Sequence, residues 1–259
     1  MIAALVIGKK NSMGCPGKNI RPLLGRPMVE YAFMAAAQSR GVDRVFTSTD
    51  SEEIAAVGKR WGAEWIQRPP ELATPDALTE DALLHAFHEM ERRVGEDLEL
   101  IVLLFANAPT IPPGRIDEGI EVLRKDQTLD SAFTVCKFNM WSPLRARRLS
   151  QDNLIEPFVD LKLLGDESEL SSIRGTGGDC YFVDLAVQVL RRNCFTNMHE
   201  GALPFKWMGQ RSYALENDYG FDIDYEWQIP VVEHWLREHG YTEAEITPRV
   251  KQKLHAVRE

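Results

Sequence analysis

Three glycines and three lysines fall within twelve residues near the start of the chain, in the run G-K-K-N-S-M-G-C-P-G-K-N from Gly8 to Asn19. Glycines let backbone N–H groups turn toward an anion and lysines add positive charge, so this composition suits a polyphosphate. The run is not a Walker A loop, because Asn19 follows Gly17 and Lys18 where Ser or Thr is required, and it contains no G-x-G-x-x-G. On composition alone, a phosphate-binding loop and a solvated basic loop explain the run equally well.

Two aspartates, Asp222 and Asp224, stand two residues apart in the last fifth of the chain. On an extended strand both carboxylates would point to the same face and could share a hard cation, for which magnesium is the natural choice. A bound metal would bridge phosphate oxygens and could lower the pKa of a coordinated hydroxyl, so that no dedicated base is needed. The alternative is a pair of solvated aspartates at the end of a strand.

Short apolar runs alternate with segments of helical periodicity over about the first 135 residues. Strands buried on both faces are predicted at residues 3–7, 44–47, 64–67, 100–105 and 132–135, and helices at 28–37, 51–61, 79–92 and 113–124. This alternation predicts an α/β fold, a Rossmann-like three-layer α/β/α sandwich with a mainly parallel sheet. Ligands of such sheets bind at the carboxyl ends of the strands.

The alternation lapses at about residues 137–179, which predicts an inserted arm or hairpin. After it we expect a strand at 180–183, a helix at 185–191, a strand ending at Asp224 and a helix at 227–239. With no internal repeat and no Gly/Ser linker, one domain over residues 1–239 is predicted, followed by a charged, helix-compatible tail at 240–259.

The charge balance and the cysteines exclude several classes of protein. Thirty Lys and Arg against thirty-nine Asp and Glu give a formal net charge of −9, so a nucleic acid or membrane partner is not expected. The four cysteines form no C-x-x-C pair, which argues against a disulfide framework or a structural zinc. The apolar run at residues 2–7 is too short for a membrane span and has no basic region before it, so a buried strand in a cytoplasmic protein is expected.

Several motifs together resemble those of the acylneuraminate cytidylyltransferases, the CMP-sialic acid synthetases and their relatives that activate octulosonic and nonulosonic acids. N-S-M-G-C-P-G-K-N is similar to the family's N-S-K-G-x-x-x-K-N, V-F-T-S-T-D-S-E-E-I-A at residues 45–55 to its V-x-V-S-T-D-S-x-E-I-A, and R-P-P-E-L-A at 68–73 to its R-P-x-E-L-A. The D-I-D of residues 222–224 matches the closing element that holds magnesium in relatives. The resemblance spans about residues 2–238.

This resemblance implies a nucleotidyltransferase that moves CMP from CTP to a sugar acid with release of pyrophosphate, and that depends on Mg²⁺. Lys18, Asp222 and Asp224 would be the catalytic residues, with the two aspartates on the metal. The nucleotide would be bound by the loop together with one residue after each of the second and third strands: Lys9, Ser12, Gly14, Lys18, Asn19, Asp50 and Arg68. Relatives use the arm to reach into a partner subunit, so a homodimer is expected.

The acceptor side follows the family less closely. Arg145 and Arg174 occupy places from which family members contact the acidic acceptor, and a guanidinium suits a carboxylate. In the segment L-L-F-A-N-A-P-T-I, however, Phe105 replaces the glutamine that touches the acceptor sugar and Ile111 replaces an arginine. Phe105 and Asn107 are therefore candidates for an altered acceptor site, although Phe105 could be ordinary core.

Three of the predicted site residues could instead have a purely structural role. Asp50 could be only a helix cap, Arg68 could pair with Glu71, and Arg145 could belong to a solvated face of the arm. For the whole chain, the alternatives are nucleotidyl transfer to a sugar phosphate or a phosphonate, and a non-catalytic nucleotide-sensing module.

Overall fold

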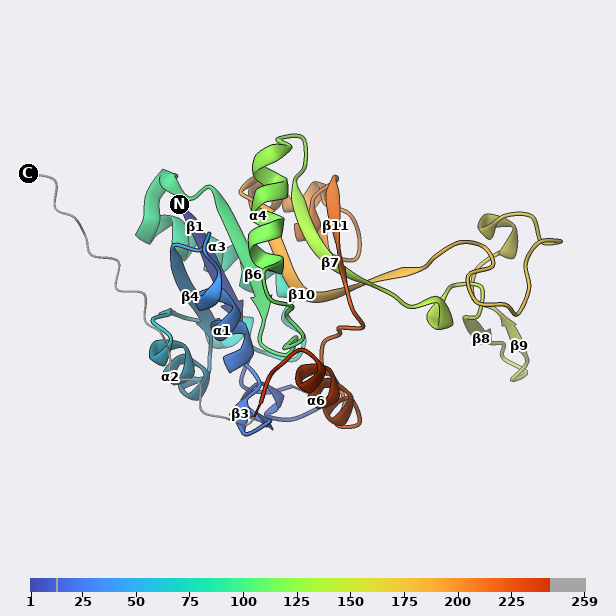
Figure 1. Cartoon of the computed structure of the whole chain (residues 1–259), viewed down its shortest axis with the longest axis horizontal. Helices are drawn as coiled ribbons and strands as arrows, with labels where there is room; N and C mark the ends of the chain where they lie inside the picture. Colours follow the sequence, from blue (N-terminus) through green and yellow to red (C-terminus); the bar gives the residue numbers. More distant parts are fainter. Residues whose placement is uncertain (13, 243–259) are drawn as a thin grey trace, which may run out of the picture.

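A seven-stranded sheet forms the centre of the molecule (Figure 1) in the computed structural model, which describes residues 1–12 and 14–242. Across the sheet the order is β11 (Ser212–Asn217), β7 (Ser131–Lys137), β10 (Tyr181–Arg191), β6 (Leu100–Phe105), β1 (Ile2–Ile7), β4 (Arg44–Thr49) and β5 (Glu64–Gln67). Only β10 runs antiparallel to its neighbours, and every other pair of adjacent strands is parallel. The predicted mainly parallel sheet is confirmed.

Helices cover both faces of this sheet. They are α1 (Glu30–Gln38), α2 (Glu52–Arg60), α3 (Thr79–Val94), α4 (Arg115–Lys125) and α5 (Asn193–Thr196), whereas α6 (Gln228–Glu238) belongs to a separate core cluster. One core cluster joins the sheet to α1, α2 and α4, and a second joins its other face to α3 and α5. Successive residues of β1 belong to opposite clusters, Ala4 and Val6 to the first and Leu5 to the second, so the strand is buried on both sides. The three-layer architecture is therefore as predicted.

Local sequence explains where α2 begins and ends. Ser51 Oγ accepts a hydrogen bond of 3.3 Å from the backbone N–H of Ile54, which is an N-cap. Glu52 lies in the first turn and Arg60 in the last, and each complements the helix dipole at its end. This geometry fixes the turn that connects the carboxyl end of β4 to the helix.

Two short hairpins lie outside the main sheet, β2 (Pro22–Leu23) with β3 (Arg26–Pro27) and β8 (Arg147–Leu149) with β9 (Ile155–Pro157). The first packs against α6 in a third core cluster, which includes Leu23 and Leu236. The second belongs to the segment between β7 and β10, which projects from the sheet as an extended arm (Figure 1). Single turns of 3₁₀ helix occur at Lys18–Ile20, Pro70–Leu72, Gly95–Asp97, Asn139–Trp141, Leu161–Leu164, Met198–Glu200 and Lys206–Met208.

The helix predicted at residues 185–191 is wrong, because this segment is the second half of β10. Its apolar residues are compatible with a helix, but the strand pairs with β6 on one side and with β7 on the other. Val187 and Val189 are β-branched and fully buried there, so tertiary pairing decided the outcome.

The strand predicted to end at Asp224 ends earlier, because β11 stops at Asn217. Asp222 and Asp224 lie in an irregular segment whose backbone bonds to the loop after β6: Ile223 N–H donates to Asn107 O at 2.8 Å. Of the predicted tail, residues 243–259 lie outside the described residues. Within the described part of the chain, no helix is long and apolar enough to cross a membrane.

Candidate active site

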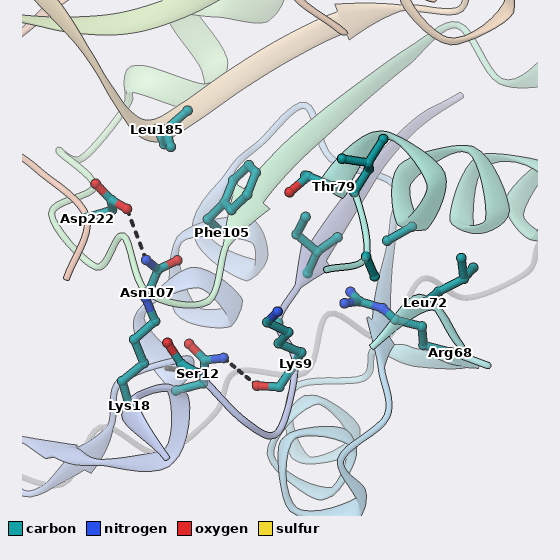
Figure 2. A pocket seen from close by; sticks show the side chains of 16 residues that line it. Lys9, Ser12, Lys18, Arg68, Leu72, Thr79, Phe105, Asn107, Leu185 and Asp222 are labelled. Carbon is teal, nitrogen blue, oxygen red and sulfur yellow. Dashed lines mark hydrogen bonds between the residues drawn. The ribbon is translucent and has the colours of Figure 1, made fainter. Parts of the chain in front are cut away.

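A pocket opens at the carboxyl end of the sheet, where the loops after β1, β5 and β6 meet the irregular segment after β11 (Figure 2). Most of the residues that line it were predicted as site residues: Lys9, Ser12, Lys18, Asn19, Arg68, Phe105, Asn107 and Asp222. Its remaining lining is mostly apolar and comes from β1, from the segment that leads into α3, and from β10: Ile7, Gly8, Leu72, Ala77, Leu78, Thr79, Ala82 and Leu185. The pocket thus has the location that this class of sheet reserves for ligands.

Lys18 joins the two ends of the chain at this pocket. Gly17 precedes it with a left-handed backbone (φ 66°), and Lys18 then begins a single 3₁₀ turn. Its Nζ donates to Ile223 O at 2.7 Å and to Asp224 Oδ1 at 2.6 Å, while only 8% of the residue is exposed. The basic loop (residues 8–19) and the acidic segment that carries the two aspartates (residues 222–224) therefore meet at one site.

Gly14 explains how closely the basic loop approaches the acidic segment. A Cβ at this position would lie 2.6 Å from Asp224 O, closer than real Cβ contacts come. A side chain at this position would therefore force the loop and the backbone at Asp224 apart. The requirement for glycine here is thus one of close approach between two backbones.

The other polar residues of the loop divide between shaping it and facing the pocket. Asn19 Nδ2 donates to Lys9 O at 2.8 Å and closes the loop on itself, while Asn19 Oδ1 is buried with no hydrogen-bond partner in the described residues. Lys9 Nζ reaches Thr74 O at 3.2 Å, and both Lys9 and Ser12 line the pocket. The loop therefore presents the positive charge of Lys9 and Lys18 to the pocket, as a cationic wall. Asn19 Oδ1 is a buried hydrogen-bond acceptor beside it.

Asp222 is the acidic member of the pocket lining. Its Oδ2 accepts a hydrogen bond of 3.1 Å from Asn107 Nδ2, which also donates to Ile223 O at 3.1 Å. Burial, followed by the nearby charge of Asp224, raises the pKa of the Asp222 carboxyl. Asn107 thus orients a carboxylate that a cation would stabilise in its charged form.

The donor set fits a magnesium ion better than a metal that needs an all-protein cage. The described residues hold no group of three or more His, Cys, Asp or Glu side chains placed to bind a metal. Magnesium needs only one or two carboxylates, because substrate phosphates and water complete its shell. Asp222 and Asp224 are the two carboxylates that would hold such an ion.

Asp50 and Arg68 lie beside the basic loop. Ser51, and not Asp50, caps α2, and Asp50 Oδ1 instead accepts from Lys10 N at 2.8 Å. Arg68 is 6% exposed, and its Nη2 donates to Ser48 O at 2.8 Å. Burial lowers the pKa of the Arg68 guanidinium, so an anion that binds beside it would relieve an unfavourable charge. The predicted Arg68–Glu71 pairing is not among the contacts of Arg68 in the described residues.

Phe105 belongs to both the pocket and the core. It ends β6, lines the pocket and packs against the second core cluster, where its ring centroid lies 6.2 Å from that of Trp207. An aromatic ring therefore occupies the strand end where a polar side chain would offer hydrogen bonds.

Arg145 and Arg174 do not line this pocket within the single chain. Both are exposed residues of the arm, and Arg145 Nη2 donates to Ser172 O at 2.6 Å in the same arm. Their predicted role at the acceptor stays a prediction.

Four residues that line the pocket or support it were not predicted from the sequence: Thr110, Asp184, Leu185 and Asn217. Thr110 Oγ1 accepts from Phe221 N at 3.1 Å, and Asn217 Nδ2 donates to Thr110 O at 3.1 Å, so both hold the segment that carries Asp222. No motif marks these residues. The single acidic residue in the apolar run Y-F-V-D-L-A-V was the one available signal, because a buried aspartate needs partners.

A mainly parallel sheet with a glycine- and lysine-containing loop after its first strand, and with carboxylates at the same edge, defines a nucleotide-binding α/β protein. Residues 3–151 match the model of the cytidylyltransferase family. This is more than half of the chain, and the chain belongs to that family.

Individual relatives agree with the predicted resemblance and confirm it. N-acylneuraminate cytidylyltransferase A of Danio rerio is 34% identical over 242 residues, which cover 93% of this chain and 52% of that protein. The N-acylneuraminate cytidylyltransferase of Escherichia coli O18:K1:H7 is 30% identical over 236 residues, covering 86% of this chain and 49% of that protein. The chain thus spans about half the length of these curated relatives.

A shorter relative and a solved structure complete the comparison. CMP-N,N'-diacetyllegionaminic acid synthase of Legionella pneumophila is 29% identical over 202 residues, covering 75% of this chain and 82% of that protein. The structure of a CMP:2-keto-3-deoxy-manno-octonic acid synthetase complexed with CTP superposes with a TM-score of 0.64 at 16% identity, over 92% of this chain and 98% of that chain. The second likeness shows that the two chains share a fold.

Proposed function

We propose that this chain transfers CMP from CTP to a sugar acid and releases pyrophosphate, in a reaction that depends on magnesium. The observation that carries the proposal is the convergence of Lys18 with Asp224 at a pocket that Asp222 also lines. Relatives of similar sequence are named for the transfer of cytidylyl groups to acylneuraminic and legionaminic acids.

The cationic wall of the pocket suits the donor nucleotide. Lys9, Lys18 and Arg68 all line the pocket, so a triphosphate there would meet positive charge although the chain as a whole is acidic. Nucleotidyl transfer needs the attacking oxygen, the phosphorus and the leaving group in line, which is a matter of positioning and electrostatics. Lys18 is held by its hydrogen bonds to Ile223 O and Asp224, and Arg68 by its hydrogen bond to Ser48 O, which serves that purpose.

Asp222 and Asp224 are the residues that would hold magnesium. When bound, the ion supplies charge neutralisation at the phosphates and lowers the pKa of an acceptor hydroxyl. Asn107 keeps the Asp222 carboxylate oriented through its amide N–H, and Lys18 does the same for Asp224 through its ammonium group.

We also propose that two copies of the chain assemble through their arms. The arm exposes many large apolar side chains, each more than half exposed: Met140, Trp141, Leu149, Leu154, Ile155, Phe158, Leu163 and Ile173. The concentration of exposed apolar side chains on one projecting segment favours a role in protein–protein contact. In such a dimer, Arg145 and Arg174 of one arm would reach the acceptor in the pocket of the other copy.

Pyrophosphate release by the purified chain tests the function. CTP is compared with ATP, GTP and UTP, each with N-acetylneuraminic, N,N'-diacetyllegionaminic, pseudaminic and 2-keto-3-deoxy-manno-octonic acids, with Mg²⁺ or with EDTA. We expect release only with CTP, one or more of the acids and Mg²⁺. Release only with a sugar phosphate or a phosphonate would replace the acceptor, and CTP binding without release with any acceptor would indicate a nucleotide sensor.

Lys10 offers a matched control within the basic loop. Its side chain is exposed and does not line the pocket, whereas Lys18 does. Lys10→Ala should keep its pyrophosphate release while Lys18→Ala loses it. Equal loss in both variants would indicate general charge attraction rather than a placed ammonium group.

A further inference from the structure

Strand β10 is irregular where it passes the pocket. Val183 pairs with Val135 and Gln188 pairs with Phe133, so the intervening residues of β10 bulge out of register with β7. At the bulge, Leu185 has a left-handed backbone (φ 59°), which residues other than glycine, asparagine and aspartate rarely adopt. Its side chain lines the pocket (Figure 2). A strained residue that faces a ligand pocket persists only where its surroundings hold it.

A buried polar pair holds the bulge. Asp184, 3% exposed, accepts a hydrogen bond from Ala186 N at 3.0 Å and another from the Thr134 hydroxyl. Thr134 Oγ1 in turn accepts from Val187 N at 2.9 Å. Asp184 and Thr134 therefore satisfy the two backbone N–H groups that follow Leu185, which the ladder with β7 leaves unpaired.

The same carboxylate reaches the segment that carries Asp222. Asp184 Oδ2 accepts from Cys136 Sγ at 3.3 Å and from Asn217 Nδ2. Gly220 packs directly on this group, since a Cβ there would lie 2.9 Å from Asp184 Oδ2 and 2.5 Å from Asn217 Nδ2. The bulge and the acidic segment are thus braced against one buried group.

The two ends of the pocket differ in chemistry. Lys9, Ser12 and Arg68 line both this pocket and an adjoining groove beside Asp50, so the cationic end continues away from β10. At the opposite end, Figure 2 shows Leu185 and Phe105 beside Asn107 and Asp222. The wall of the pocket near Asp222 therefore includes apolar surface from Leu185 and Phe105.

We propose that Leu185 is a specificity-determining residue for the acceptor and that Thr134 and Asp184 are the positioning residues that hold it in place. With Phe105 it forms an apolar contact surface, which selects a sugar acid that presents a deoxygenated carbon, a methyl or a methylene group, in place of a hydroxylated one. The inference rests on the proposed function, because it takes this end of the pocket for the acceptor.

Matched acceptors test the selectivity. N-acetylneuraminic acid is compared with its monodeoxy derivatives, each of which lacks one hydroxyl, by kcat/KM for pyrophosphate release from CTP. One derivative should be used about tenfold better than the parent acid by the wild type, a ratio typical of an apolar pocket that receives or lacks a polar group. If no derivative is preferred to the parent, the apolar selection is wrong.

Leu185→Asn and Leu185→Gly distinguish the contribution of the Leu185 side chain from that of the backbone conformation at the bulge. Both residues accept a left-handed conformation, so the bulge is retained while the apolar contact is lost. The preference for the deoxy acceptor should fall to within about twofold in both variants. Leu203→Asn is the control, since Leu203 is 79% exposed and does not line the pocket, and it should keep the preference. A preference that persists in Leu185→Gly would overturn the role of this residue.

Thr134→Val tests the positioning role, because valine keeps the shape of threonine without its hydroxyl. The deoxy preference should fall as in the Leu185 variants, while the Kd for CTP measured by calorimetry stays within about twofold of the wild type, since the side-chain hydrogen bonds of Thr134 join it to Asp184 and Val187 and not to the cationic end. Equal losses in CTP binding and acceptor preference would mean that Thr134 serves only stability.

The outcomes distinguish this inference from the proposed function. Turnover of a sugar acid with no effect of the Leu185 variants on acceptor preference refutes the inference and leaves the function in place. Absence of turnover with every acid, in a wild-type chain that binds CTP, refutes both.

Discussion

Lys18 Nζ lies 2.6 Å from Asp224 Oδ1, although 206 positions separate the two residues in the sequence. The pair is asymmetric, because the Lys18 side chain is 10% exposed whereas that of Asp224 is 56% exposed. Because the Asp224 carboxylate is exposed, solvent screens its ion pair with Lys18, which adds at most about 1 kcal/mol to stability. Its significance is positional, since it places an ammonium group and two carboxylates at one edge of the sheet.

Replacement of Lys18 should therefore affect turnover far more than folding. Lys18→Ala is expected to lower kcat/KM for CTP by about 10² to 10³, the loss typical when one preorganised charge donor is removed. Lys18→Arg should retain part of the activity, because it keeps the charge but not the geometry. The checks are steady-state kinetics and thermal unfolding. A drop in Tm of more than about 5 °C in Lys18→Ala would instead assign the residue a structural role.

Asp222→Asn should abolish turnover without loss of stability. Burial and the neighbouring Asp224 raise the pKa of Asp222, so the folded chain binds a proton that the unfolded chain has already released. The wild type therefore loses stability as pH rises from the ordinary aspartate pKa through the raised one, and an asparagine does not incur this loss. At neutral pH the variant should unfold at the wild-type temperature or above it.

Magnesium provides the control for that prediction. A bound cation favours the charged Asp222, so added Mg²⁺ and CTP together should raise the Tm of the wild type more than that of Asp222→Asn. Asp224→Asn should lose turnover as well. Wild-type turnover in either variant would contradict the metal-binding role of the aspartates.

The sequence-based predictions succeeded where burial alone decides the structure. The apolar run of β6 can only be a buried strand, and its predicted bounds agree with the structure. The segment at residues 185–191 has no such signature, because a helix and a strand both bury its apolar residues, and only the pairing with β6 and β7 distinguishes them. Local pattern could not supply that non-local information.

The candidate site divides in the same way. The basic loop and the two aspartates could be found because their composition or spacing is unusual for a surface. Asp184 and Thr134 could not be assigned, because their role arises from hydrogen bonds across three strands and from the backbone strain at Leu185. Residues that shape a pocket through non-local contacts have no recognisable local sequence pattern.

Arg68 should contribute to nucleotide affinity and not to acceptor affinity. Its guanidinium is buried, its pKa is lowered by that burial, and it lines the cationic end of the pocket. Arg68→Met keeps much of the apolar volume and should weaken CTP binding about tenfold, the loss typical of one hydrogen bond to a charged group. Calorimetric titration with CTP and the KM of the acceptor are the measurements. An acceptor KM that changes while CTP affinity does not would place Arg68 at the other substrate.

Arg145 and Lys18 should complement each other across a dimer if the arm of one copy completes the pocket of the other. Lys18→Ala and Arg145→Ala variants are each expected to be nearly inactive as homodimers. After they are mixed, unfolded and refolded together, random pairing should make half of the dimers mixed, each with one intact site and one doubly altered site. About a quarter of the wild-type activity should return. Sedimentation at micromolar concentration verifies the dimer. A mixture that stays inactive although mixed dimers form would assign Arg145 to the site of its own copy, and a chain that sediments only as a monomer would exclude the shared site.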